Sequence, residues 1–156
     1  MWILLFIGAG VVSAFVHLFI VGFGVGTSIV CSIFLLHQFV VPSALIGILG
    51  FIINVLKADK TAKNLGWPGG PFQWKYGFSQ LGVGVMGVMS IWFRGQFWLG
   101  TLVTLYVYGA SGLWSHAGLM IQNKKADKVE IANIVLDIVY HAALTVLILQ
   151  IPSVWA

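Results

Sequence analysis

The chain has 156 residues, of which 60% are hydrophobic and only 8% are charged, and its mean hydropathy is +1.00. This composition excludes a soluble globular domain and predicts a single integral membrane domain over 1–156. The formal net charge is +4, but nearly all charged residues lie in short stretches beside apolar runs, which excludes nucleic acid as a partner. Cys31 is the only cysteine, so the chain can form neither an intrachain disulfide nor a thiolate metal cluster.

Apolar runs of membrane-crossing length predict an all-α fold, a polytopic transmembrane helical bundle with five spans. Residues 1–56 carry no charge and are too long for one crossing of about 30 Å of hydrocarbon, so the chain must turn back at the glycine-rich segment 22–28. If the first run is re-entrant, four spans are the alternative. The predicted helices cover about 2–21, 29–56, 71–93, 96–122 and 129–150.

The lysines predict an orientation, because basic residues concentrate in cytoplasmic loops. Seven of the eight basic residues flank two connections, whereas Arg94 alone lies between the third and fourth helices. We therefore expect a multi-pass protein of the cytoplasmic membrane, with the amino terminus inside and the carboxyl terminus outside. Most tryptophans lie near helix ends, where indole is favoured, but Trp114 does not and is expected to pack within the protein. The seven lysines are Lys57, Lys60, Lys63, Lys75, Lys124, Lys125 and Lys128.

A polar segment and a turn rich in proline and glycine join the second and third predicted helices. Residues 57–64 are polar at helical spacing, so they are expected to extend the second helix along the inner surface. The turn that follows is predicted to be a docking surface on the inner side of the membrane. Its residues are Gly66, Trp67, Pro68, Pro71, Phe72 and Gln73.

Small residues recur on one face of several predicted helices, and in lipid such faces are packing seams. The polar side chains Asn54 and Gln80 lie close to these seams in the sequence. Residues 82–87 match the GxGxxG dinucleotide-binding pattern, but they lie inside a predicted membrane helix with no preceding strand, so we interpret them as packing residues. The clearest seams are Ser43, Gly47 and Gly50 on the second helix, and Gly77, Gly84 and Gly87 on the third.

The last predicted span carries a polar stripe. Asn133, Asp137 and His141 are four residues apart, so a helix aligns them on one face. A carboxylate near the bilayer centre costs roughly 2.5 to 3.5 kcal/mol on insertion scales, so this face must meet protein. The rise per residue puts His116 roughly 9 Å and Asp137 roughly 12 Å from the inner ends of their helices. We therefore predict a His116–Asp137 pair that locks two helices, or has a proton or ligand role, in an interhelical polar network that includes Asn54.

His17 and His37 lie at comparable depth, toward the outer halves of the first and second predicted helices. Imidazole is the commonest metal ligand and a frequent haem ligand, so the residues leave open a site for quinone or haem. However, each histidine is alone on its helix and the chain has no HExxH motif. We therefore predict no metal site, no cofactor and no catalytic residue, and ordinary hydrogen bonds between helices for the two histidines.

A series of short motifs follows Asp59. They are Gly66-Trp67-Pro68, Pro71-Phe72-Gln73, Gly77, Leu81, Gly84, Val85, Gly87, Arg94-Gly95, Phe97-Trp98, His116, Met120-Ile121 and Asp137. In these motifs the chain resembles an uncharacterised family of small bacterial and archaeal membrane proteins, a domain of unknown function with DoxX-like architecture. The family tends to have Glu, His and Asp where this chain has Lys75, Asn54 and Gly112. The resemblance thus implies the fold and the His116–Asp137 pair, but only half of the polar network.

The resemblance also implies a role that depends on partners, because DoxX-like proteins include membrane subunits of quinone-linked oxidoreductases. We expect a small accessory subunit of a larger membrane complex, an oxidoreductase in this interpretation, with no catalytic centre of its own. Its expected partners are other membrane subunits and lipid, or further copies of itself. Two alternatives stay open: a binder of a hydrophobic small molecule, quinone or haem, through intramembrane histidines, and a proton or small-solute transporter that uses Asp137.

Overall fold

The structure is a computed structural model that describes residues 2–65, 68–124 and 127–155. Within these ranges every regular element is a helix, which confirms the all-α part of the predicted fold class. The long helices are α1 (Trp2–Val21), α2 (Thr27–Phe51), α4 (Pro71–Met89), α5 (Gln96–Asn123) and α6 (Lys128–Leu149). Three short elements accompany them: a π-helix (Ile52–Leu56), α3 (Ala58–Leu65) and a 3₁₀-helix (Pro152–Val154).

Three of the described helical segments are long and apolar enough to cross a membrane: Ile3–Val21, Thr27–Leu56 and Lys128–Leu149. The other two long helices are less apolar, since α4 begins with a polar turn that contains Gln73 and Lys75, and α5 ends with Gln122 and Asn123. The number of spans above three therefore stays a prediction.

Two predicted helices differ in detail from those observed. The second helix continues after Phe51 as a π-helix, because the Lys57 amide donates to the Ile52 carbonyl, 2.8 Å away and five residues back. The third helix ends at Met89, four residues earlier than expected, and a turn then leads to Gly95 at a φ of 60°.

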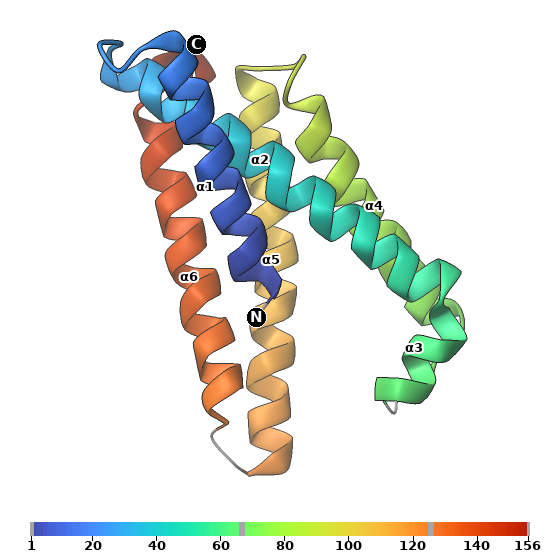
Figure 1. The fold of residues 1–156 in the computed structure, drawn as a ribbon. Helices are drawn as coiled ribbons and strands as arrows, with labels where there is room; N and C mark the ends of the chain where they lie inside the picture. Colours follow the sequence, from blue (N-terminus) through green and yellow to red (C-terminus); the bar gives the residue numbers. More distant parts are fainter. Residues whose placement is uncertain (1, 66–67, 125–126, 156) are drawn as a thin grey trace.

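The long helix α2 is the centre of the fold (Figure 1). It packs against α1 through its first half and against α4 through its second half, from Phe39 onward, and it also contacts α6. The helices α5 and α6 form an antiparallel hairpin. The α2–α4 contact confirms the predicted seam: Gly47 and Gly84 meet so closely that a Cβ on Gly47 would lie 2.8 Å from the Gly84 Cα. Backbones approach this closely only where side chains are absent.

The hydrophobic core lies at one end of the molecule. Phe39 of α2, Leu105 of α5 and Leu144 of α6 belong to it, and so does Trp98, which is 2% exposed and donates a hydrogen bond from Nε1 to the Ser90 carbonyl. The residues of this core come mainly from the first half of α2, the first half of α5 and the end of α6.

The other end of the α5–α6 hairpin has no such core. None of the described residues from 110 to 143 is buried, and α2 and α4 lean away from this part of the hairpin in Figure 1. We call the described residues 110–124 and 127–143 the open hairpin. Trp114 lies on it and is 83% exposed, so the prediction that this side chain packs within the protein is wrong for the single chain.

Candidate functional site

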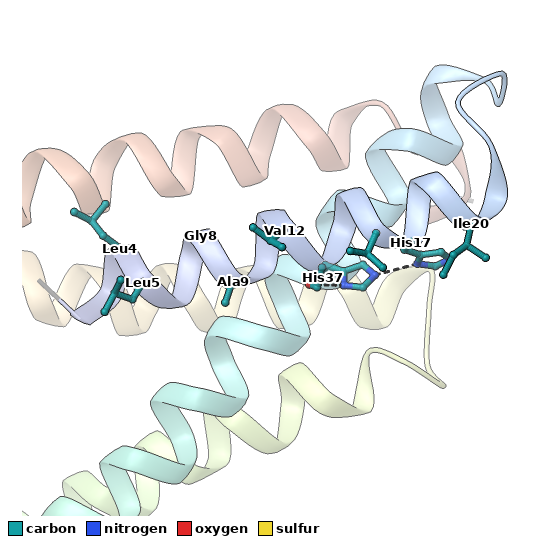
Figure 2. Close-up of a pocket in the computed structure, with 10 residues that line it drawn as sticks. Leu4, Leu5, Gly8, Ala9, Val12, His17, Ile20 and His37 are labelled. Carbon is teal, nitrogen blue, oxygen red and sulfur yellow. Dashed lines mark hydrogen bonds between the residues drawn. The ribbon is translucent and has the colours of Figure 1, made fainter.

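A hydrogen-bonded chain of three side chains connects α1 to α2. His17 Nδ1 lies 3.0 Å from His37 Nε2, and His37 Nδ1 lies 2.8 Å from the Ser13 hydroxyl oxygen. Ser13 can also donate to the Gly10 carbonyl, 3.0 Å away in the preceding turn. The sequence predicted comparable depth for the two histidines, and the structure brings their rings together (Figure 2).

This chain of side chains lies in a shallow groove of about 1040 Å³ along the outer face of α1. Apart from the three residues named above, the groove is lined by apolar side chains and one glycine. These are Leu4, Leu5, Gly8, Ala9, Val12, Val16 and Ile20. The groove is therefore apolar along its length, with imidazole and hydroxyl groups near one end (Figure 2).

The second polar group of the structure lies in the α5–α6 hairpin, around Asp137 and His141. The His141 Nδ1 is 3.3 Å from the Asp137 carboxylate and 2.8 Å from the Asp137 carbonyl, and its Nε2 is 3.1 Å from the Leu105 carbonyl. The His141 ring thus reaches the backbone of α5 through the Leu105 carbonyl, while it lies beside Asp137 of its own helix. Gly109 of α5 leaves room for both side chains, since a Cβ there would lie 2.8 Å from Nε2 and 3.1 Å from the carboxylate.

The predicted His116–Asp137 pair is wrong. His116 Nδ1 pairs instead with the carboxylate of Glu130, in the first turn of α6. Rise per residue gave the depth of each side chain but not the register of the hairpin, in which His116 is opposite Glu130 and Asp137 is opposite Gly109. Glu130 lies in the first turn of the predicted helix 129–150, seven residues before Asp137, and so shares its face of α6.

Asn54 was predicted to belong to the same network as the histidines and carboxylates, but it hydrogen-bonds to neither group. It lies in the π-helix and donates to the Gln80 side-chain oxygen, 2.9 Å away, and Gln80 donates in turn to the Tyr108 hydroxyl, 2.8 Å away. This chain of hydrogen bonds joins the π-helix, α4 and α5, and both Asn54 and Gln80 are buried. Asn133 is half-buried on α6, one turn before Asp137.

We expect replacement of Gln80 by leucine to lower the free energy of unfolding by about 1–3 kcal/mol. The substitution removes both hydrogen bonds and leaves the buried Asn54 amide without its acceptor. Reversible unfolding in mixed micelles measures the difference. Ser79→Ala is the matched control, because that exposed hydroxyl bonds only the Lys75 carbonyl of its own helix. Equal stabilities of the two variants would contradict the role of the Gln80 bonds.

The predicted inner-surface turn is described in part, since Gly66 and Trp67 lie outside the described residues. Phe72 is exposed, whereas Gln73 is buried and donates to the Ala58 carbonyl at 3.2 Å. Gln73 thus holds α3 against the start of α4 and is not part of a free surface. Pro68 and Pro71 are exposed.

Metal binding needs several ligands at one place. Among the residues that the structure describes, no group of three His, Cys, Asp or Glu side chains could share an ion.

Apolar helices of membrane-crossing length, which pack through glycine seams and carry paired ionisable side chains, are typical of an integral membrane protein. The chain belongs to a family that carries the description "Family of unknown function (DUF6790)", whose sequence profile matches residues 1–153. Comparison with curated proteins and with solved structures gave no match. Membership of an uncharacterised family is thereby confirmed, and it covers the first half of the chain as well as the motifs after Asp59. The DoxX-like architecture stays a prediction.

Proposed function

We propose that this protein is an accessory subunit of a larger membrane complex, and that the open hairpin is the surface that another subunit covers. The proposal includes the five predicted spans and the amino terminus inside. In support of that orientation, α3, the end of α5 and the start of α6 lie toward one end of the molecule in Figure 1, and the turn between α4 and α5 lies toward the other. Lys60, Lys63, Lys124 and Lys128 belong to the first end and Arg94 to the second.

The observation that carries the proposal is the exposure of charged groups on the open hairpin. The Asp137 side chain is 28% exposed, although it lies nine residues after Lys128, or about 13 Å along the helix. Glu130 and His116 are also only partly covered. Apolar residues of a membrane protein can face lipid, but carboxylates at such depth face protein or a water-filled cavity. None of the described residues from 110 to 143, the part of the hairpin that carries these three side chains, is buried, so a second protein is the simplest cover.

Trp114 supports the same surface. It lies ten residues before Lys124, which is about 15 Å along α5, and it is almost fully exposed. Indole prefers the headgroup level to the bilayer centre, whereas tryptophan is enriched among the residues that carry binding energy at protein interfaces. An indole at this depth is therefore suited to a protein contact.

Site-specific photo-crosslinking in the membranes of the native host tests the proposal. We expect a photoreactive phenylalanine analogue at Trp114 to give one discrete protein adduct, whereas the same analogue at Val146, which is exposed beside the core end of α6, gives lipid adducts. The Trp114 adduct should disappear in an Asp137→Leu background. Lipid adducts at both positions would overturn the proposal. An adduct with a second copy of this chain would replace it with a homo-oligomer.

The oxidoreductase as the host complex stays a prediction from the resemblance. The transporter alternative also stays a prediction, and it differs in one measurable way. A transporter moves protons or solute when it is alone in liposomes and loses this activity on Asp137→Asn, whereas an accessory subunit gives no flux by itself.

A further inference from the structure

We propose that the groove on α1 binds a lipid-soluble molecule whose head carries a carbonyl or hydroxyl oxygen, and that His17 Nε2 is the atom that recognises this oxygen. This site is independent of the open hairpin. It lies at the other end of the sequence and consists of Ser13, His17, His37 and the apolar residues of the groove.

The hydrogen bonds among these three side chains leave one imidazole nitrogen free. His37 uses both ring nitrogens, one toward Ser13 and one toward His17. His17 uses Nδ1 for His37, and its Nε2 has no protein partner among the described residues. Because His17 lines the groove, a bound molecule can reach this nitrogen. An imidazole nitrogen near the end of an apolar groove provides one polar contact in an otherwise apolar site, which is the usual composition of small-molecule sites.

The same chain lets His17 Nε2 act either as donor or as acceptor. If Ser13 donates to the Gly10 carbonyl, His37 Nδ1–H donates to Ser13, His17 Nδ1–H donates to His37, and His17 Nε2 is left as an acceptor for a hydroxyl. If Ser13 donates to His37 instead, every bond reverses and His17 Nε2–H donates to a carbonyl. Both arrangements keep all the internal hydrogen bonds between side chains. The site can thus recognise the oxidised or the reduced form of one head group, as in a quinone and its quinol.

The length of the groove indicates what kind of tail the bound ligand has. From Leu4 to Ile20 the groove follows α1 for 16 residues, or about 24 Å, which suits a linear or isoprenoid tail. His17 lies only four residues from the end of α1, so the head group lies close to the membrane surface and the tail extends toward the bilayer centre. A lipid-soluble molecule with one polar end adopts this orientation in a bilayer without the protein.

Binding of decylbenzoquinone and its quinol to the full chain in phosphatidylcholine nanodiscs tests the inference, with decylbenzene as the ligand that lacks the oxygens. We expect saturable binding of both oxygenated ligands to one site, with affinities within about threefold of each other, since His17 can donate or accept. His17→Phe should weaken both by about tenfold, the effect of one lost hydrogen bond, and should leave decylbenzene unchanged. An equal loss for all three ligands, or no loss, would overturn the role of His17.

The groove itself is tested with a variant that fills it. Val12 lines the groove and is 64% exposed, so Val12→Trp blocks the groove without disturbing the packing of α1. Phe19→Trp is the matched control, because Phe19 is 76% exposed on the same helix but does not line the groove. We expect Val12→Trp to abolish saturable binding and Phe19→Trp to retain it. Equal binding by the two variants, or binding no greater than that of empty nanodiscs, would rule out the site.

Discussion

Replacement of Gly87 by alanine is expected to separate α4 from α2 and to lower the free energy of unfolding by about 3 kcal/mol or more. A Cβ at this position would fall on the Phe39 carbonyl oxygen and the Ser43 side chain, far inside van der Waals contact. The Phe39 carbonyl belongs to the backbone of α2, which cannot move aside as a flexible side chain can. Thermal or denaturant unfolding in micelles measures the loss, and a Cys pair across α2 and α4 reports whether the helices still touch.

Neighbouring glycines of the same helix give an internal scale for this effect. At Gly84 a Cβ would lie 3.0 Å from the Gly47 Cα, which is tight, and at Gly82 nothing lies within 4 Å. We therefore expect Gly84→Ala to be intermediate. Gly82→Ala should be neutral or should stabilise α4 by up to about 1 kcal/mol through helix propensity. If all three variants behave alike, helix propensity and not close packing governs this seam. The result would also decide how to interpret residues 82–87, whose GxGxxG pattern is here a set of two packing glycines and one open one.

The sequence predicted these packing glycines because small residues that recur on one face of a membrane helix allow two helix backbones to approach closely. It also predicted that His17 and His37 share a level, since both are polar side chains on apolar helices that a short turn connects. Hydropathy could not show which face of each helix meets lipid, because these helices are apolar on nearly every side. The hydropathy of the sequence therefore predicted neither the exposure of Trp114 nor the absence of buried residues in the open hairpin.

The sequence also did not predict how each helix is rotated about its axis or how α5 and α6 are aligned with each other. The pair His116–Asp137 was inferred from depth alone, yet two side chains meet across a hairpin only if both point into the interface. The sequence did offer Glu130 as an alternative partner for His116, since Glu130 lies seven residues before Asp137 and thus on the same face of α6. The buried hydrogen bonds of Gln80 with Tyr108 likewise depend on how α4 and α5 are rotated, which hydropathy does not encode.

His141→Leu is expected to destabilise the protein much more than Asp137→Leu does, although the two substitutions break the same pair. Without Asp137, the chain loses the charge itself, and His141 still bonds the Leu105 carbonyl. Without His141, the Asp137 carboxylate loses its partner, and an unpaired carboxylate in the membrane costs roughly 2.5 to 3.5 kcal/mol on insertion scales.

A double variant tests this difference. Asp137→Leu removes the carboxylate itself, so a variant that carries both Asp137→Leu and His141→Leu should be more stable than His141→Leu alone. Free energies of unfolding at pH 7 measure the three variants. Equal losses for the two single variants would mean that Asp137 is solvated by water in the single chain, and the open hairpin would then need no second protein to cover it.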